Sequence, residues 1–275
     1  MIPSILFQDD DLMVIDKPPG MVVNRAESVK GETVEEWAEK QPDCHSGLPA
    51  RRCYASSVAG GRAGILKMPD QVRHDNVVEN SDLISDFVNR AGIVHRIDKE
   101  TSGILLIAKN PESFIELQRQ FKERLVKKTY LALVHGTIAE EGTINAPVGR
   151  LPWNREHFGV VPGGKESVTR FKRVTSCELR VAEKNEIVSL VEVYPETGRT
   201  HQIRVHFKYI GHPLLGDYLY AGRVQSRDDR KEIPRVMLHA WKISFTHPKT
   251  GLPLAYEAPI PDDMRRIIPS STNYE

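Results

Sequence analysis

Short apolar stretches, alternating or unbroken, recur along most of the chain with polar turns between them. Residues 4–8 and 12–16 predict two strands, and Lys17-Pro18-Pro19-Gly20 ends the second because Pro-Pro-Gly forces a turn. The unbroken apolar run at 103–108 predicts a buried strand. Further strands are expected at 92–94, 128–134, around Val148, and at 168–171, 179–181 and 187–193.

Three short helices are expected between these strands. The capping-box spacing of Thr33 and Glu36 opens one that runs to residue 40. Asn110 followed by Pro111 opens the second, which carries apolar residues at three- and four-residue steps on one face. The third covers 201–210, with a glycine at 211 to end it.

The final apolar pattern, at 243–256, alternates on both sides of Pro248-Lys249-Thr250-Gly251 and predicts a hairpin. Strands dominate and few helices separate them. The fold class expected is therefore α+β, with a central mixed, mainly antiparallel sheet and flanking helices. No regular period is present between about 41 and 89, so this stretch is expected to be a loop-like insertion.

Composition narrows the class of protein. The 275 residues include 38 Lys+Arg and 37 Asp+Glu, a net charge of +1, with 40% hydrophobic residues. That balance excludes wholesale disorder, and there is no long uncharged apolar run for a membrane span. Near-neutral charge also argues against a generic nucleic-acid binder. The acidic N-terminal region does not resemble a signal peptide.

Cysteine usage favours a reducing compartment. Cys44, Cys53 and Cys177 make an odd number without an export signal, so we expect a cytoplasmic protein without a disulfide framework. Cys44, His45 and Cys53 cluster, but structural zinc needs about four ligands and no second Cys/His pair is near. No metal is therefore expected.

Two polar segments are candidates for chemistry. Residues 95–103, HRIDKETSG, lie between two apolar strands, which is where sites tend to occur. Asp98 could be a nucleophile or base, held ionised by neighbouring cations. It could equally belong to an ordinary turn, accepting from the backbone of Thr101 or Ser102, with Gly103 supplying a special dihedral angle. Spacing alone favours the turn.

The second segment, ETGRTHQIRVH at 196–206, joins a strand to a helix. Arg199 and Arg204 near a helix start could hold an anion, although a solvated basic face is the commoner explanation. Tyr130 could be a core aromatic or a stacking surface for a base, with the preceding lysines at phosphates. Phosphate-loop, dinucleotide and GxSxG motifs are absent.

Together these segments resemble the RluA-type pseudouridine synthases, which convert uridine to pseudouridine in ribosomal or transfer RNA. The family's His-Arg-Leu-Asp-x-x-Thr-Ser-Gly-Leu-Leu-Leu signature stands here as HRIDKETSGILL, with Ile97 replacing a leucine. Other family blocks follow in order over most of the chain: DKPPGM, VKKTYLALVHG, ETGRTHQIRVH, GHPLLGD, LHAWKISFTHPKTG and APIPDDM.

The resemblance implies roles for single residues. Asp98 matches the nucleophilic aspartate, which attacks uridine at the sugar or at the base. Tyr130 matches the tyrosine that packs on the uracil. A basic residue pairs with the aspartate, and Arg204 is our choice, with Arg199 in reserve. Arg96 matches an arginine that enters the RNA helix, and Leu238 lines the uracil pocket. Other expected substrate or RNA contacts are His95, Thr101, Lys128 and Arg199.

The expected function is isomerisation of specific uridines in structured ribosomal or transfer RNA, without a cofactor and without contact with a membrane. A hydrolytic glycosidase would need two carboxylates, whereas one aspartate among arginines suits a single nucleophile. An RNA-binding or RNA-folding module without turnover is the alternative, and a nucleoside hydrolase is a second. The chain is expected to form one catalytic domain over 1–275, without an upstream S4-type domain, and to act as a monomer.

The charge distribution modifies the argument from net charge. Basic residues gather at Arg96 and Lys99, at 124–128, and at Arg199 and Arg204, whereas acids gather elsewhere. Phosphate binding depends on charge within about 10 Å, the Debye length, and net charge says little about it. One basic cleft is therefore expected to bind RNA.

Overall fold

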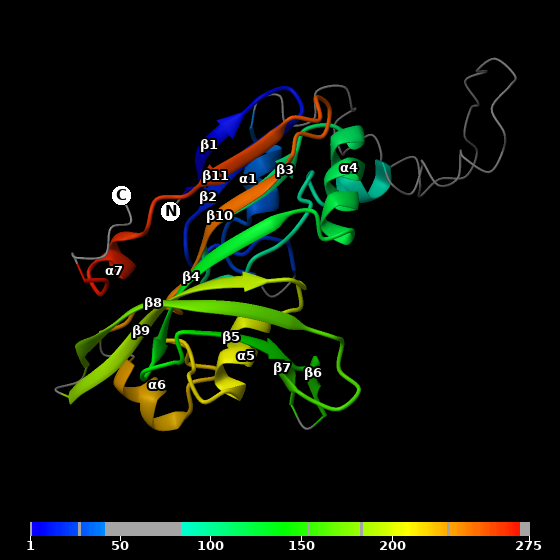
Figure 1. Cartoon of the computed structure of the whole chain (residues 1–275). Coiled ribbons are helices and arrows are strands. Elements are labelled where there is room, and N and C mark those ends of the chain that lie inside the picture. The colour runs from blue at the N-terminus through cyan, green and yellow to red at the C-terminus, as the bar shows by residue number, and fades with distance from the viewer. Residues whose placement is uncertain are drawn as a thin grey trace, which may run out of the picture.

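The protein has an α+β fold built on a single large sheet (Figure 1). A computed structural model describes residues 2–26, 29–41, 84–152, 154–181, 184–229 and 232–269. In chain order its strands are β1 (Ser4–Gln8), β2 (Leu12–Lys17), β3 (Ser102–Ala108), β4 (Lys127–His135), β5 (Glu141–Asn145), β6 (Val148–Leu151), β7 (Asn154–Val160), β8 (Val168–Val181), β9 (Lys184–Pro195), β10 (Leu238–Thr246) and β11 (Pro253–Glu257). Its named helices are α1 (Val34–Glu39), α4 (Pro111–Lys122), α5 (Gln202–Tyr209), α6 (Arg223–Asp229) and α7 (Asp262–Arg265).

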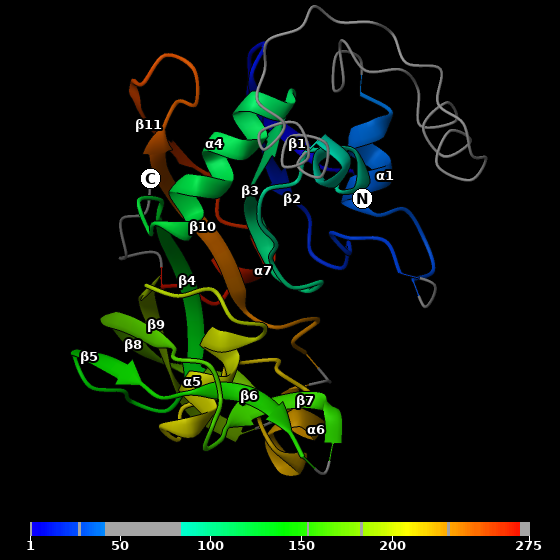
Figure 2. The same ribbon diagram turned by 90° about the vertical axis from the view of Figure 1, so that its right-hand side faces the viewer.

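The main sheet, as described, has nine strands in the order β1-β2-β3-β10-β4-β9-β8-β5, with β11 pairing β10. Of its pairings only β3 with β10 is parallel, which confirms a mixed and mainly antiparallel sheet. A separate pair, β6 and β7, lies beside α5 (Figure 2). Among the described residues, no helix combines the length and the apolar character that crossing a bilayer requires.

Helices cover both faces of the β2–β3 region because alternate residues of a strand point to opposite faces. Met13 and Ile15 pack in one core cluster with Trp37 of α1, whereas Leu12 and Val14 pack with α4 in another. The predicted caps are present. Thr33 and Glu36 form a capping box, and Asn110 accepts a hydrogen bond from the Ser113 amide. Farther along the sheet, α5 packs against β4 and β9.

The parallel seam between β3 and β10 depends on Gly103. Its φ of +108° lies where L side chains are rare, and an added Cβ would stand 2.3 Å from the Ala240 carbonyl oxygen. The special dihedral predicted for this glycine is thus present. On its other side Ala240 pairs with Tyr130 of β4, so β10 alone separates the end of the HRIDKETSG segment from Tyr130.

Several details differ from the sequence predictions. Strands β5 and β7 and helices α6 and α7 were not predicted. The strand expected at 92–94 is a single bridge, Ile93 to Ile107, because a left-handed glycine at 92 turns the chain immediately before it. The strands expected at 168–171 and 179–181 are one strand, β8, whose register shifts between Arg173 and Thr175. Residues 84–89, expected to be the end of a loop, are helical and bury Phe87. The rest of the expected insertion, 42–83, with its zinc candidates Cys44, His45 and Cys53, lies outside the described residues.

Candidate active site

The loop that carries Asp98 is held in place by a buried lysine. Lys17, fully buried at the end of β2, donates from Nζ to the carbonyl oxygens of Pro18, Met21 and Lys99 at 2.8, 2.9 and 3.1 Å. Burial lowers the pKa of Lys17 to about 7. The Gly20 amide donates to the same Lys99 carbonyl. The loop before β3 is therefore tied to the Pro-Pro-Gly turn at two points.

The Asp98 side chain faces Arg204. The main-chain carbonyl of Asp98 accepts from the Thr101 amide at 3.1 Å, so the backbone, and not the carboxylate, makes the turn. The carboxylate Oδ2 lies 3.4 Å from a terminal guanidinium nitrogen of Arg204. The ordinary-turn explanation predicted that the Asp98 carboxylate accepts from the backbone of Thr101 or Ser102. The carboxylate faces Arg204 instead, so that explanation is wrong.

Arg204, on α5, is itself held by an aspartate. Its Nε and second terminal nitrogen donate to Asp217 at 2.7 and 2.9 Å, in the bidentate geometry that suits a guanidinium and a carboxylate. Both side chains are buried. Burial opposes the charge on Arg204, but its hydrogen bonds to Asp217 and the nearby carboxylates raise the pKa of the guanidinium. The choice of Arg204 over Arg199 fits this geometry, since Arg199 donates instead to the Glu166 carbonyl.

A cavity of about 540 Å³ opens in front of this pair. Asp98, Arg204 and Leu238 line it, as does Tyr130. Burial, with the Asp98 charge nearby, raises the pKa of the Tyr130 phenol, so the hydroxyl keeps its proton at neutral pH. Tyr130 can therefore offer an aromatic face and a hydrogen-bond donor, whereas the carboxylate of Asp98 is the candidate nucleophile.

Positive charge surrounds the cavity. Its described lining has two acidic residues, Asp98 and Glu196, and Glu196 is paired with Arg170 at 2.8 Å. The basic residues in the lining are Arg90, Arg96, Lys122, Arg124, Lys128, Arg199 and Arg204. An anionic polymer would therefore be attracted to this opening, although the whole chain is nearly neutral.

A comparison with known proteins identifies the family. The sequence profile of the RNA pseudouridylate synthase family matches residues 11–209. The chain belongs to this family. The RluA-type resemblance is confirmed by curated relatives that cover nearly the whole chain.

Two relatives within the pseudouridine synthase family are named for ribosomal RNA. Ribosomal large subunit pseudouridine synthase D of Nitrosomonas europaea is 38% identical over 98% of this chain, and that of Pseudomonas aeruginosa is 35% identical over 94%. An uncharacterized RNA pseudouridine synthase, YlyB, of Bacillus subtilis is 37% identical over 96%. The chain spans 65% of the Nitrosomonas protein, 69% of the Pseudomonas protein and 71% of the Bacillus protein.

A solved pseudouridine synthase structure agrees with the fold. Human RNA pseudouridylate synthase domain containing 1 matches with a TM-score of 0.62 at 26% identity, covering 94% of this chain and 83% of that one. The α+β fold with its mixed, mainly antiparallel sheet is thus the synthase fold expected from the sequence.

All nine residues predicted for the synthase site line the cavity, but not all in the expected way. His95 is part of the framework: its Nε2 accepts from the Leu106 amide at 3.0 Å, and its ring stacks on Phe121. Burial lowers the pKa of His95 to about 3, so the ring is neutral. Thr101 is buried, and burial lowers the pKa of the Lys128 ammonium. Arg96 is exposed at the opening.

Sequence reasoning missed three residues around Arg204. Asp217 lies in the quoted GHPLLGD block, but its position gave no sign of a partner 13 residues earlier. Tyr220 packs its ring under the guanidinium at 5.0 Å, and its hydroxyl lies 2.8 Å from Nδ1 of His201. His201 reaches Asp98 from the other side, with its Nε2 3.9 Å from Oδ1. None of these contacts is local, so periodicity could not have revealed them.

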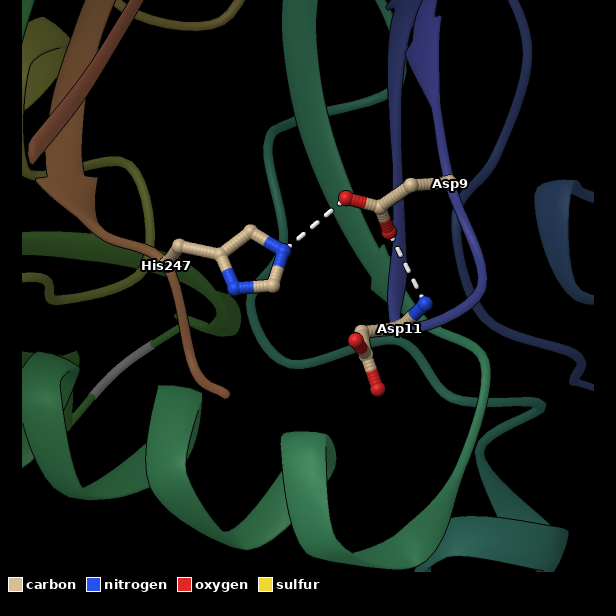
Figure 3. A group of neighbouring side chains, drawn as sticks. All are labelled: Asp9, Asp11 and His247. Atoms are coloured by element: carbon tan, nitrogen blue, oxygen red, sulfur yellow. Dashed lines mark hydrogen bonds and ion pairs between the residues drawn. The ribbon is translucent and has the colours of Figure 1, made fainter. Parts of the chain in front are cut away.

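A second polar cluster, Asp9, Asp11 and His247, joins two turns at the far end of the sheet (Figure 3). His247 Nδ1 accepts from the Thr250 amide at 3.0 Å, so its proton sits on Nε2, which lies 2.9 Å from Asp9. The other Asp9 oxygen accepts from the Asp11 amide. These hydrogen bonds join the β1–β2 turn to the β10–β11 turn, so the cluster has a structural role.

Proposed function

We propose that the chain is an RNA pseudouridine synthase in which Asp98 is the nucleophile. The observation that carries the proposal is the Asp98 carboxylate beside the buried Arg204–Asp217 pair, at the wall of a basic cavity. An ionised carboxylate is the form that can attack a sugar or a base.

In the reaction proposed, Asp98 attacks the uridine at the ribose C1′ or at the base, and the bond between C1′ and N1 breaks. The uracil rotates and a bond forms between C1′ and C5. The bond to Asp98 breaks, either displaced from C1′ by C5 or released from the base, so the carboxylate is regenerated. C5 then loses its proton and N1 gains one. Nothing is consumed, so no oxidant, water or cofactor is required. Tyr130 would pack on the uracil and Leu238 would close the pocket behind it.

The target uridine must leave its helix to reach the cavity, because stacked bases are inaccessible to a carboxylate on a cavity wall. Arg96, exposed in the cavity lining, would occupy the space left behind, and the surrounding basic residues would meet phosphates. The names of the relatives favour large-subunit ribosomal RNA over transfer RNA as the substrate. A cytoplasmic location accords with such a substrate.

The test is the variant Asp98→Ala, assayed on large-subunit ribosomal RNA transcribed in vitro with tritium at uridine C5. We expect the wild type to release tritium to water and to form pseudouridine, and Asp98→Ala to form none while binding RNA within about threefold of the wild-type Kd. Product from Asp98→Ala would refute the mechanism.

The rival functions give different products. An RNA-binding module would bind the transcript and release no tritium from any RNA, including transfer RNA. A nucleoside hydrolase would liberate free uracil, which chromatography separates from the polymer. Asp16→Asn serves as a matched control, because Asp16 is another aspartate near the loop but does not line the cavity.

A further inference from the structure

His201, at the residue before α5, has an unusual backbone conformation. Its φ of 55° is in the left-handed region, which few non-glycine residues occupy and which costs free energy. In this conformation its imidazole lies between Tyr220 and Asp98. Phe158 of β7 packs edge-on against the ring, with centroids 5.7 Å apart. The surroundings thus hold the ring in one place on the wall of the cavity.

The hydrogen bonds around Tyr220 determine which imidazole nitrogen carries the proton. The Tyr220 hydroxyl accepts from the Phe158 amide at 3.2 Å and lies 2.8 Å from His201 Nδ1. Tyr220 is 2% exposed, and among the described residues the acceptor for its hydroxyl proton is Nδ1. Since Nδ1 accepts, the neutral ring carries its proton on Nε2.

That Nε2–H faces the carboxylate of Asp98. Nε2 lies 3.9 Å from Oδ1, while Oδ2 of the same carboxylate faces Arg204 at 3.4 Å. The first distance is longer than a hydrogen bond, so the two groups face each other without being bonded in the free protein. The two oxygens of Asp98 therefore have different neighbours: a cation for Oδ2 and a neutral N–H donor for Oδ1.

The ring is neutral at physiological pH. Burial lowers the pKa of His201, with Arg204 and Arg96 acting in the same direction and Asp98 and Asp217 opposing them. These four charged groups and the Tyr220 hydroxyl are the polar groups that face the imidazole among the described residues. A neutral donor orients a carboxylate without neutralising it, which suits a group that must stay nucleophilic.

We infer that His201 is a positioning residue for the reaction: its Nε2–H orients Oδ1 of Asp98 toward the substrate, and Tyr220 fixes the tautomer that makes this possible. The inference rests on the proposed role of Asp98 as nucleophile. It makes Phe158 and Tyr220, which touch no reacting atom, part of a chain of hydrogen bonds that ends at the reacting carboxylate.

Two substitutions of His201 distinguish its contact with Tyr220 from its contact with Asp98. Asparagine tolerates the left-handed conformation and can place an amide where Nδ1 was, but it is too short to reach Asp98. Glutamine can place an amide N–H close to the position of Nε2. We expect His201→Asn to lower the single-turnover rate constant about 10-fold, with the RNA Kd within about twofold of wild type, and His201→Gln to keep it within about threefold.

Tyr220→Phe tests the tautomer without changing the ring. Without the hydroxyl, the imidazole proton is divided between Nδ1 and Nε2, so the rate constant at pH 7.5 should fall about threefold. At acidic pH the imidazolium carries a proton on both nitrogens, so the ratio of variant to wild-type rate should return toward one. A structural role for Tyr220 would give a defect that does not depend on pH.

Several results would overturn the inference. They are a wild-type rate for His201→Asn, equal losses for the Asn and Gln variants, and a pH-independent defect in Tyr220→Phe. The Asp98→Ala assay keeps this test separate from that of the function. Product from Asp98→Ala refutes the nucleophile, whereas an inactive Asp98→Ala with fully active His201→Asn refutes only the role of His201. Thermal unfolding of each variant confirms that it is folded.

Discussion

At the scale of single residues, the site depends on the arrangement of three charged side chains: Asp98, Arg204 and Asp217. Asp217 neutralises Arg204 and leaves one guanidinium nitrogen for Asp98, at the longer distance of 3.4 Å. Because Asp217 makes the two short hydrogen bonds, Asp98 has a cation nearby without being fully engaged by it. This arrangement suits a nucleophile, since a carboxylate held in a tight ion pair is less reactive than one with a single longer contact.

Asp217→Asn should therefore reduce catalysis as well as stability. With its carboxylate partner neutral, Arg204 is expected to move toward Asp98, and the rate of pseudouridine formation should fall about 100-fold. Breaking a buried ion pair should lower the free energy of unfolding by about 3 kcal/mol. Tritium release and urea denaturation measure the two effects.

The matched control is Asp263→Asn, because Asp263 forms a similar bidentate pair with Arg235 and does not line the cavity. It should lower stability with a rate within about threefold of wild type. A normal rate in Asp217→Asn would show that Asp98 does not depend on this pair.

At the scale of elements, short sequence motifs predicted the features that depend on neighbouring residues, such as helix caps and turns. The capping box at Thr33, the N-cap at Asn110 and the buried run of β3 act within a few residues, and the sequence predicted them correctly. The union of two predicted strands into β8 depends on pairing along all of β9, which no local pattern records. Likewise, the resemblance supplied Asp98, Tyr130 and Arg204, whereas the contacts of Asp217, Tyr220 and His201 arise only from packing.

One such contact links β4 to the end of α6. His135 Nδ1 lies 3.0 Å from Glu186 and Nε2 lies 3.2 Å from Asp229, which also accepts from the Gly216 amide beside Asp217. Burial opposes the charge, yet these carboxylates raise the pKa of His135 above 6.5. A raised pKa in the folded state stabilises the fold below the unfolded value, and this contribution disappears as pH rises through the folded value.

His135→Gln should therefore cost more stability at pH 6 than at pH 9. Because the raised pKa favours the protonated imidazole of the folded state, we expect the destabilisation at pH 6 to exceed that at pH 9. Urea denaturation of both proteins at the two pH values gives the comparison. An equal loss at both values would mean that the imidazole is not charged in the folded protein.

At the scale of the whole molecule, charge is distributed unevenly. The chain has a net charge of +1, yet the described cavity lining holds five more basic than acidic residues, seven against two. The segments that bring them come from both sides of the sheet centre, namely the loop before β3, the end of α4, β4 and the start of α5. The net charge of the chain therefore says little about its ability to bind an anionic polymer. The location of the basic residues around the cavity says more.

RNA binding should accordingly depend on salt through few contacts. About four phosphate contacts give a slope near −3 in a plot of log K against log salt concentration. Arg124→Ala should make the slope less steep by about 0.7, whereas Lys40→Ala, on an exposed lysine outside the cavity, should not change it. Filter binding at several potassium chloride concentrations measures both. A slope near −8 would indicate a basic surface far larger than this opening.

The contact between Arg204 and Asp98 joins residues 106 positions apart. Closing so long a loop costs entropy that only the completed sheet repays. Asp98 lies before β3 and Arg204 lies in α5, so the pair forms only once both segments are in the same fold. A nascent chain that ends before α5 has Asp98 without this cation, so the candidate site is incomplete until α5 has been made.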